Sequence, residues 1–96
     1  MYKLTKLAAE DFASIYNYTM QRFGDAQADY YTEALETFFD TLSQMPDIGR
    51  EYTLVHDVMR VEFHSHTIFY SIRDNDILIV RILHQQMNHS RYFSCC

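Results

Sequence analysis

The chain has 96 residues, a formal net charge of −5 and a hydrophobic content of 48%. This length predicts one domain, residues 1–96, and a chain with so much apolar character, two Gly and one Pro is not disordered. The net negative charge argues against sequence-independent binding of nucleic acid, because such binding needs Lys and Arg to neutralise phosphates. No apolar run approaches the roughly 20 residues that cross a bilayer.

The first six residues can form a short strand with Tyr2 and Leu4 apolar, and they lack the apolar core of a secretory signal. The only two cysteines, Cys95 and Cys96, are adjacent, so no disulfide framework is expected. A cytoplasmic location is therefore predicted.

Residues 7–23 are predicted to form a helix, because apolar residues recur along one face. Glu10 and Asp11 suit the positive end of its dipole. Gly24 is expected to close this helix in the left-handed conformation, and Asp25 to cap the next one. The apolar face consists of Ala8, Phe12, Ile15, Thr19 and Phe23.

A second helix follows and ends at Pro46. Its apolar residues are spaced alternately by three and four, which places them on one stripe. Two helices joined so tightly are expected to form an antiparallel hairpin. The stripe consists of Ala28, Tyr31, Leu35, Phe38, Leu42 and Met45.

From residue 58 the apolar period changes to two, which indicates strands. A turn is expected at His64-Ser65, and Asp74-Asn75 is expected to form a two-residue hairpin turn, since both of its side chains tolerate positive φ. The strands cover about residues 58–63, 66–73 and 77–84. The sequence therefore predicts an α+β domain with an N-terminal strand, an antiparallel helix hairpin and a three-stranded antiparallel meander. Residues 85–96 are expected to be a tail that is flexible or dependent on a partner.

Catalytic, metal and cofactor signatures are weak. His64 and His66 are two residues apart but flank a turn, and no Cys or carboxylate pair lies at ligand spacing nearby, so no metal site is expected. Gly24 and Gly49 are too few for a phosphate-binding loop, so no nucleotide cofactor is expected. No nucleophile motif is present.

Five acidic residues, which we call the acidic strip, share one face of the second helix. Like charges at this spacing repel by about 0.2–0.5 kcal/mol per pair. One interpretation of the strip is a solvated face that aids solubility. The other is a docking surface for a basic partner, and in this second interpretation Asp29, Glu33 and Glu36 contact that partner. Its members are Asp25, Asp29, Glu33, Glu36 and Asp40.

Strict alternation along the last strand places Arg81 on one face with Ile77, Ile79 and Leu83, and places Leu78, Val80 and Ile82 on the other. One face of the sheet is expected to pack on the helices. The other would be apolar with an arginine, which is typical of a protein-binding surface unless residues 85–96 cover it.

These residues together resemble the ParE pattern of the RelE/ParE toxin–antitoxin superfamily. The resemblance covers almost the whole chain and is most specific in Arg60, His66-x-Ile68-x-Tyr70 and Arg81-Ile82-Leu83-His84-x-x-Met87. Its usual Met-Asp ending is Met87-Asn88 here. The other matching positions are Ala8, Ala9, Glu10, Asp11, Phe12, Ile15, Tyr18, Gly24, Ala28, Tyr31, Leu35, Phe39, Leu42 and Pro46-x-x-Gly49-Arg50.

The resemblance implies a cytoplasmic toxin that poisons DNA gyrase by protein contact, without catalysis or a cofactor, and a co-expressed antitoxin that wraps it. No direct nucleic-acid or membrane binding is expected. The candidate partner-binding residues in the strand region are Arg60, Arg81, His84 and Met87.

Two alternatives stay open. RelE-like members of the superfamily are ribosome-dependent mRNA endonucleases, and Arg81, Arg91 and Tyr92 are the residues that could serve such a reaction here. Gln85 and Gln86 stand where positive charge would be needed to stabilise the transition state. The other alternative is a divergent toxin with a different target.

Overall fold

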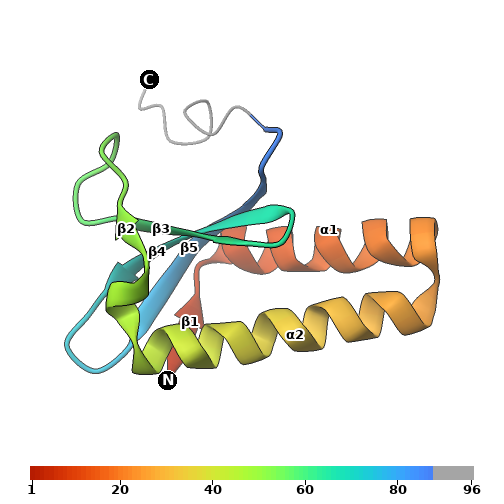
Figure 1. Cartoon of the computed structure of the whole chain (residues 1–96), viewed down its shortest axis with the longest axis horizontal. Coiled ribbons are helices and arrows are strands. Elements are labelled where there is room, and N and C mark those ends of the chain that lie inside the picture. The colour runs from red at the N-terminus through yellow and green to blue at the C-terminus, as the bar shows by residue number, and fades with distance from the viewer. Residues whose placement is uncertain (88–96) are drawn as a thin grey trace.

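The computed structural model describes residues 1–87, in which one face of a five-stranded sheet packs against two long antiparallel helices (Figure 1). The predicted N-terminal strand, helix hairpin and antiparallel meander are confirmed. None of the helices in residues 1–87 has the length and apolar character needed to cross a bilayer. The elements are β1 (Tyr2–Leu4), α1 (Lys6–Phe23), α2 (Asp25–Gln44), η1 (Pro46–Ile48), β2 (Arg50–Glu51), β3 (Met59–Phe63), β4 (His66–Ile72) and β5 (Ile77–His84).

The strands lie in the order β1-β5-β4-β3-β2. β1 is parallel to β5, with Tyr2 opposite Ile77 and Leu4 opposite Ile79, and all other neighbours are antiparallel. β2 is not predictable from the sequence, because two residues carry no periodicity, and no local signal indicates the place of β1 in the sheet.

The helix ends differ in detail from the prediction. Thr5 is the N-cap of α1 and accepts a hydrogen bond from the Ala8 N–H at 3.0 Å, so Glu10 and Asp11 lie beyond the first turn and their predicted dipole role is wrong. Gly24 has φ 92° and ψ 172°, which is not the left-handed helical conformation. It caps both α1 and α2, and Asp25 is the first residue of α2 rather than its cap.

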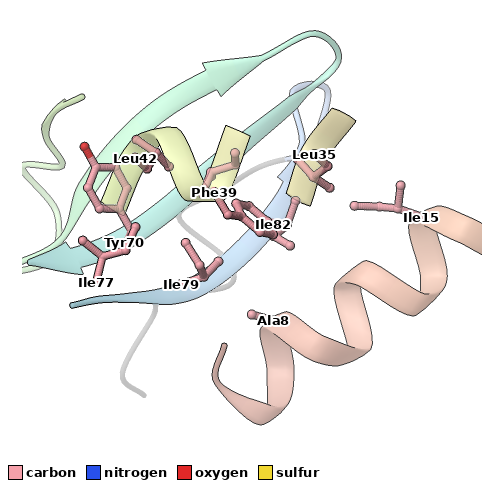
Figure 2. Packing of buried hydrophobic residues seen from close by; sticks show 10 residues of the cluster. Ala8, Ile15, Leu35, Phe39, Leu42, Tyr70, Ile77, Ile79 and Ile82 are labelled. Carbon is pink, nitrogen blue, oxygen red and sulfur yellow. The ribbon is translucent and has the colours of Figure 1, made fainter. Parts of the chain in front are cut away.

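The main core lies between the helices and the sheet, and it joins residues from α1, α2, β4 and β5 (Figure 2). Phe39, 1% exposed, is the buried aromatic residue of α2, whereas Phe38 is half-buried and stacks on Phe63. Met45, predicted on the buried stripe, is 53% exposed. A strict alternation of three and four drifts from the true helical period, which accounts for both differences. The buried members are Ala8, Ile15, Leu35, Phe39, Leu42, Ile68, Tyr70, Ile77, Ile79 and Ile82.

A β-bulge in β5 shifts the pattern of faces. Ile79 lies opposite Tyr70 but Arg81 lies opposite Phe69, so Val80 is an extra residue. Ile82 therefore joins the core between the sheet and the helices, and Leu83 joins Phe69 in a second apolar cluster. The strict alternation predicted for residues 77–83 is wrong at this point, because a bulge moves every later side chain to the opposite face.

The predicted turn at His64-Ser65 is confirmed, whereas the two-residue turn predicted at Asp74-Asn75 is wrong, because Ile72 pairs with Ile77 and the link between them has four residues. His64, with φ 53°, lies in a two-residue turn between Phe63 and His66. Asp74-Asn75 lies in a longer link, neither residue has a positive φ, and Arg73 belongs to the link rather than to β4. Residues 85–87 follow β5 as a turn, and the remainder of the predicted tail, with Arg91 and Tyr92, lies outside the described residues.

Candidate functional site

A groove of about 470 Å³ lies between α1 and the C-terminal end of β5. We call it the α1–β5 groove. Its wall on α1 includes Ile15 and Tyr18, and its wall on β5 includes Ile82 and His84. Met87 also lines it, so the fold brings the predicted partner-binding residues His84 and Met87 together.

Arg81 is held against α1 at the edge of this groove. Its Nε and Nη2 donate to the two carboxylate oxygens of Asp11 at 2.8 and 2.9 Å. The side chains of Arg81 and Asp11 are only 14% and 15% exposed. A bidentate pair with so little solvent access fixes both groups in position and neutralises the arginine.

Asp11 and Thr5 also close the edge of β5 beyond the short strand β1. The Asp11 carboxylate accepts the N–H of Ile82 at 3.0 Å, and the Thr5 hydroxyl donates to the carbonyl of Val80 at 2.8 Å. These are edge groups that would otherwise attract another strand. Sequence reasoning missed this role of Asp11, because the partner lies 70 positions away.

Two histidines that line the α1–β5 groove lie across from each other. His66 on β4 is the register partner of His84 on β5, with ring centroids 5.4 Å apart. The Tyr31 hydroxyl lies 2.7 Å from Nδ1 of His66, where the tautomer decides which group donates.

Burial changes the pKa values of His66 and Tyr31. It lowers the pKa of His66 to about 4, with a further lowering from the positive charge that His84 can carry and an opposing effect of Asp11. Burial also raises the pKa of Tyr31 to about 12. The side chains of His66 and Tyr31 are therefore neutral at pH 7, and a neutral His66 beside apolar residues suits contact with a protein. In residues 1–87 no group of three or more His, Cys, Asp or Glu residues is arranged to hold a metal ion.

The other predicted residues lie on different surfaces. Arg60 is opposite Phe69 on the sheet face away from the helices, where its Nη2 donates to Glu62 at 2.9 Å and its guanidinium lies 5.9 Å from the centre of the Tyr52 ring. The acidic strip is exposed along α2, and its member Asp29 accepts a hydrogen bond from the Tyr16 hydroxyl at 2.9 Å. The structure thus separates the predicted partner-binding residues into the α1–β5 groove, the β2–β3 edge and the acidic strip.

Comparison with known proteins relates the whole fold to one family. A family model described as "ParE toxin of type II toxin-antitoxin system, parDE" matches residues 2–89. The chain is 32% identical over 88 residues to Toxin ParE1 of Caulobacter vibrioides, an alignment that covers 91% of each chain. It is 33% identical over 92 residues to Toxin ParE1 of Mycobacterium tuberculosis, covering 94% of each chain.

A solved structure, "Chromosomal ParDE TA system from P. aeruginosa", has the same fold. The TM-score is 0.75, and the match covers 86% of this chain and 92% of that chain. At 21% sequence identity this likeness concerns the fold alone.

Proposed function

Because the chain belongs to the ParE toxin family of type II toxin–antitoxin systems, we propose that it arrests bacterial growth by binding DNA gyrase. A cognate antitoxin neutralises it by binding the toxin chain. The protein acts in the cytoplasm, and it works by protein contact rather than by catalysing a reaction. The family match over residues 2–89 is the observation that carries this proposal.

The α1–β5 groove supports a binding role. Its lining is largely apolar, and burial lowers the pKa of its lining residue His66 to about 4, so that this side chain is neutral at pH 7. Apolar surface with a few convergent polar groups is typical of the core of a protein–protein interface.

The Asp11–Arg81 pair weighs against the ribosome-dependent nuclease alternative. A nuclease needs positive charge directed at the phosphate where negative charge develops. The charge of Arg81 is instead balanced by Asp11 in a bidentate contact. We therefore infer that Arg81 organises the groove and does not act on RNA.

The test is to induce the chain in bacteria while DNA and protein synthesis are followed with labelled precursors. The expected result is that DNA synthesis fails first, that the purified chain inhibits supercoiling by gyrase, and that co-expressed antitoxin reverses both effects. Early failure of protein synthesis with cleaved messages would favour the nuclease. Growth arrest without inhibition of gyrase would favour another target.

A further inference from the structure

One exposed face of α1 borders the α1–β5 groove and carries two large side chains. Leu7 is 50% exposed and Tyr18 is 56% exposed. Asp11, Ser14 and Tyr18 line the groove, and Leu7 extends the same side of the helix by one turn. The four residues are spaced by four, three and four positions, which aligns them along one side of a helix. We call these four residues the α1 face.

The α1 face points away from α2. The Tyr16 hydroxyl donates to Asp29 of α2 at 2.9 Å, so the side of α1 that carries Tyr16 is turned toward α2. Tyr18 is two positions further along, which is about 200° around the helix. Figure 1 shows α2 running along one side of α1. The α1 face is therefore on the opposite side of α1 from the acidic strip.

Charges on the α1 face are balanced within the chain. Asp11 is held in the bidentate contact with Arg81. The guanidinium of Arg22 lies 5.4 Å from the centre of the Tyr18 ring, which holds that ring in place. A face without unbalanced charge suits the centre of a protein interface, where charged residues are depleted.

The spacing of the α1 face is self-complementary. Two copies of α1 that pack antiparallel about a twofold axis make every contact twice. An axis between residues 12 and 13 sets Leu7 opposite Tyr18 of the other copy and Asp11 opposite Ser14. The alternative register, shifted by one heptad, would set Tyr18 opposite Ser14 and leave Leu7 beyond the end of the other α1. Only the first register pairs apolar with apolar side chains and polar with polar ones.

Asp11 retains an acceptor site for the contact with Ser14. Its Oδ2 accepts hydrogen bonds from Nε of Arg81 and from the N–H of Ile82, and its Oδ1 accepts one from Nη2 of Arg81. A carboxylate has about four acceptor sites, so one on Oδ1 is unused by the residues that the structure describes. The Asp11 side chain lines the groove, and Ser14 is exposed. The Ser14 hydroxyl of a second copy can donate to that site.

We propose that two copies of this chain associate through the α1 face, with α1 of each copy lying in the α1–β5 groove of the other. The pairing buries Leu7 and Tyr18 and keeps the acidic strips of the two copies on opposite sides of the dimer. Because the groove is then occupied, self-association excludes any other protein from it. The inference goes beyond the proposed function and holds whether or not the chain binds gyrase.

The first measurement is sedimentation equilibrium of the purified chain over a range of concentrations. We expect a reversible dimer that is half-formed at roughly 10 µM chain, because a single helix pair buries a small interface. Higher salt should strengthen the dimer, since each copy carries a net charge of −5 that opposes association. A chain that stays monomeric up to about 200 µM would overturn the proposal and leave the groove to a partner of different sequence.

A pair of charge variants tests the α1 face. Ser14→Glu places a carboxylate opposite Asp11 of the other copy, and we expect it to weaken the dimer at least about tenfold. Ala13→Glu adds the same charge at the adjacent exposed residue, which is about 100° around the helix and does not line the groove. Ala13→Glu should leave the dimer affinity unchanged. Equal weakening by both variants would mean that net charge alone governs association, which would overturn the role of the α1 face.

Cysteine cross-linking tests the register. In a Cys95→Ser, Cys96→Ser background, the double variant Leu7→Cys, Tyr18→Cys should form disulfide-linked dimers under mild oxidation, because the two thiols lie opposite each other across the interface. The helix separates positions 7 and 18 of one chain by about 16 Å, so no disulfide can form within a chain. Neither single variant should cross-link, since its thiol then faces an unmodified residue. No cross-link in the double variant, or equal cross-linking by the single variants, would overturn the register.

Discussion

Asp11 in α1 and Arg81 in β5 form a bidentate ion pair across 70 positions of sequence, and the same carboxylate accepts the N–H of Ile82. The pair joins the helix hairpin to the sheet at the edge of the α1–β5 groove. It therefore links the stability of the fold to the shape of the surface that we propose as a binding site.

We expect Asp11→Ala to destabilise the chain by about 3 kcal/mol, because it leaves a largely buried guanidinium unpaired and removes the acceptor of the Ile82 N–H. Urea denaturation measures the change. Adding Arg81→Met to Asp11→Ala should recover part of the loss, since the unpaired charge is gone. A loss below about 0.5 kcal/mol for Asp11→Ala would mean that the ion pair does not stabilise the fold.

Tyr70 connects the core to the segment that precedes β2. We expect Tyr70→Phe to cost about 1–3 kcal/mol, because the Gly49 N–H and the Pro46 carbonyl each lose a partner. Gly49→Ala should also destabilise, because its Cβ would collide with the Tyr70 hydroxyl. Tyr30→Phe is the control, since Tyr30 is 68% exposed. Thermal unfolding of the three variants provides the comparison, and equal melting temperatures for Tyr70→Phe and Tyr30→Phe would contradict the expectation.

His66 should make stability depend on pH. Its pKa is about 4 in the folded chain against 6.5 for an ordinary histidine, so the unfolded chain binds more protons between these values. The contribution of the neutral His66 to the free energy of unfolding is complete above pH 6.5 and is lost as the pH falls from 6.5 toward 4. Denaturation at several pH values should show that the free energy of unfolding falls less steeply for His66→Gln than for the unmodified chain as the pH decreases from 6.5 to 4. Parallel curves would show that His66 does not titrate in this way.

The α1–β5 groove should contain contacts for a partner. Tyr18 is 56% exposed and lines the groove, so Tyr18→Ala should leave thermal stability almost unchanged while weakening binding to the antitoxin or to gyrase by about tenfold or more. Tyr30→Ala removes a tyrosine that is 68% exposed and is not among the groove residues, and this variant should bind normally. Calorimetry with each partner distinguishes the two, and normal binding by Tyr18→Ala to both would argue against the groove.

The acidic strip offers a test of its two interpretations. If it is a solvated face, replacing Asp29, Glu33 and Glu36 with the corresponding amides should leave partner affinity unchanged. The change should also relieve repulsion of about 0.2–0.5 kcal/mol per pair. Binding assays at low and physiological salt measure the effect. A clear loss of affinity at low salt would instead identify the strip as a docking surface.

Much of the fold could be predicted because its signals are local. The apolar stripe on α2 and the alternation in β3 and β4 repeat within a few residues. Pro46 prevents α2 from continuing past its own position. The candidate site was predicted only in part. His84 and Met87 were named and do line the groove, but Tyr18 and Ile15 were not connected with them, because a helix residue gives no sign of which strand it will meet.

By itself, the sequence determined the order and type of the main elements, the α+β class and the resemblance to a toxin family. Periodicity and motif spacing depend only on residues close together in the chain, so they can be recognised without a tertiary structure. The tertiary structure alone decided that Val80 is an extra residue that changes the face of everything after it, and that Arg81 turns to Asp11. It also decided that the Tyr70 hydroxyl binds the Pro46 carbonyl and the Gly49 N–H in the segment before β2. Each of these depends on a contact between residues far apart in the chain, and such a contact exists only once the sheet and the helices have packed together.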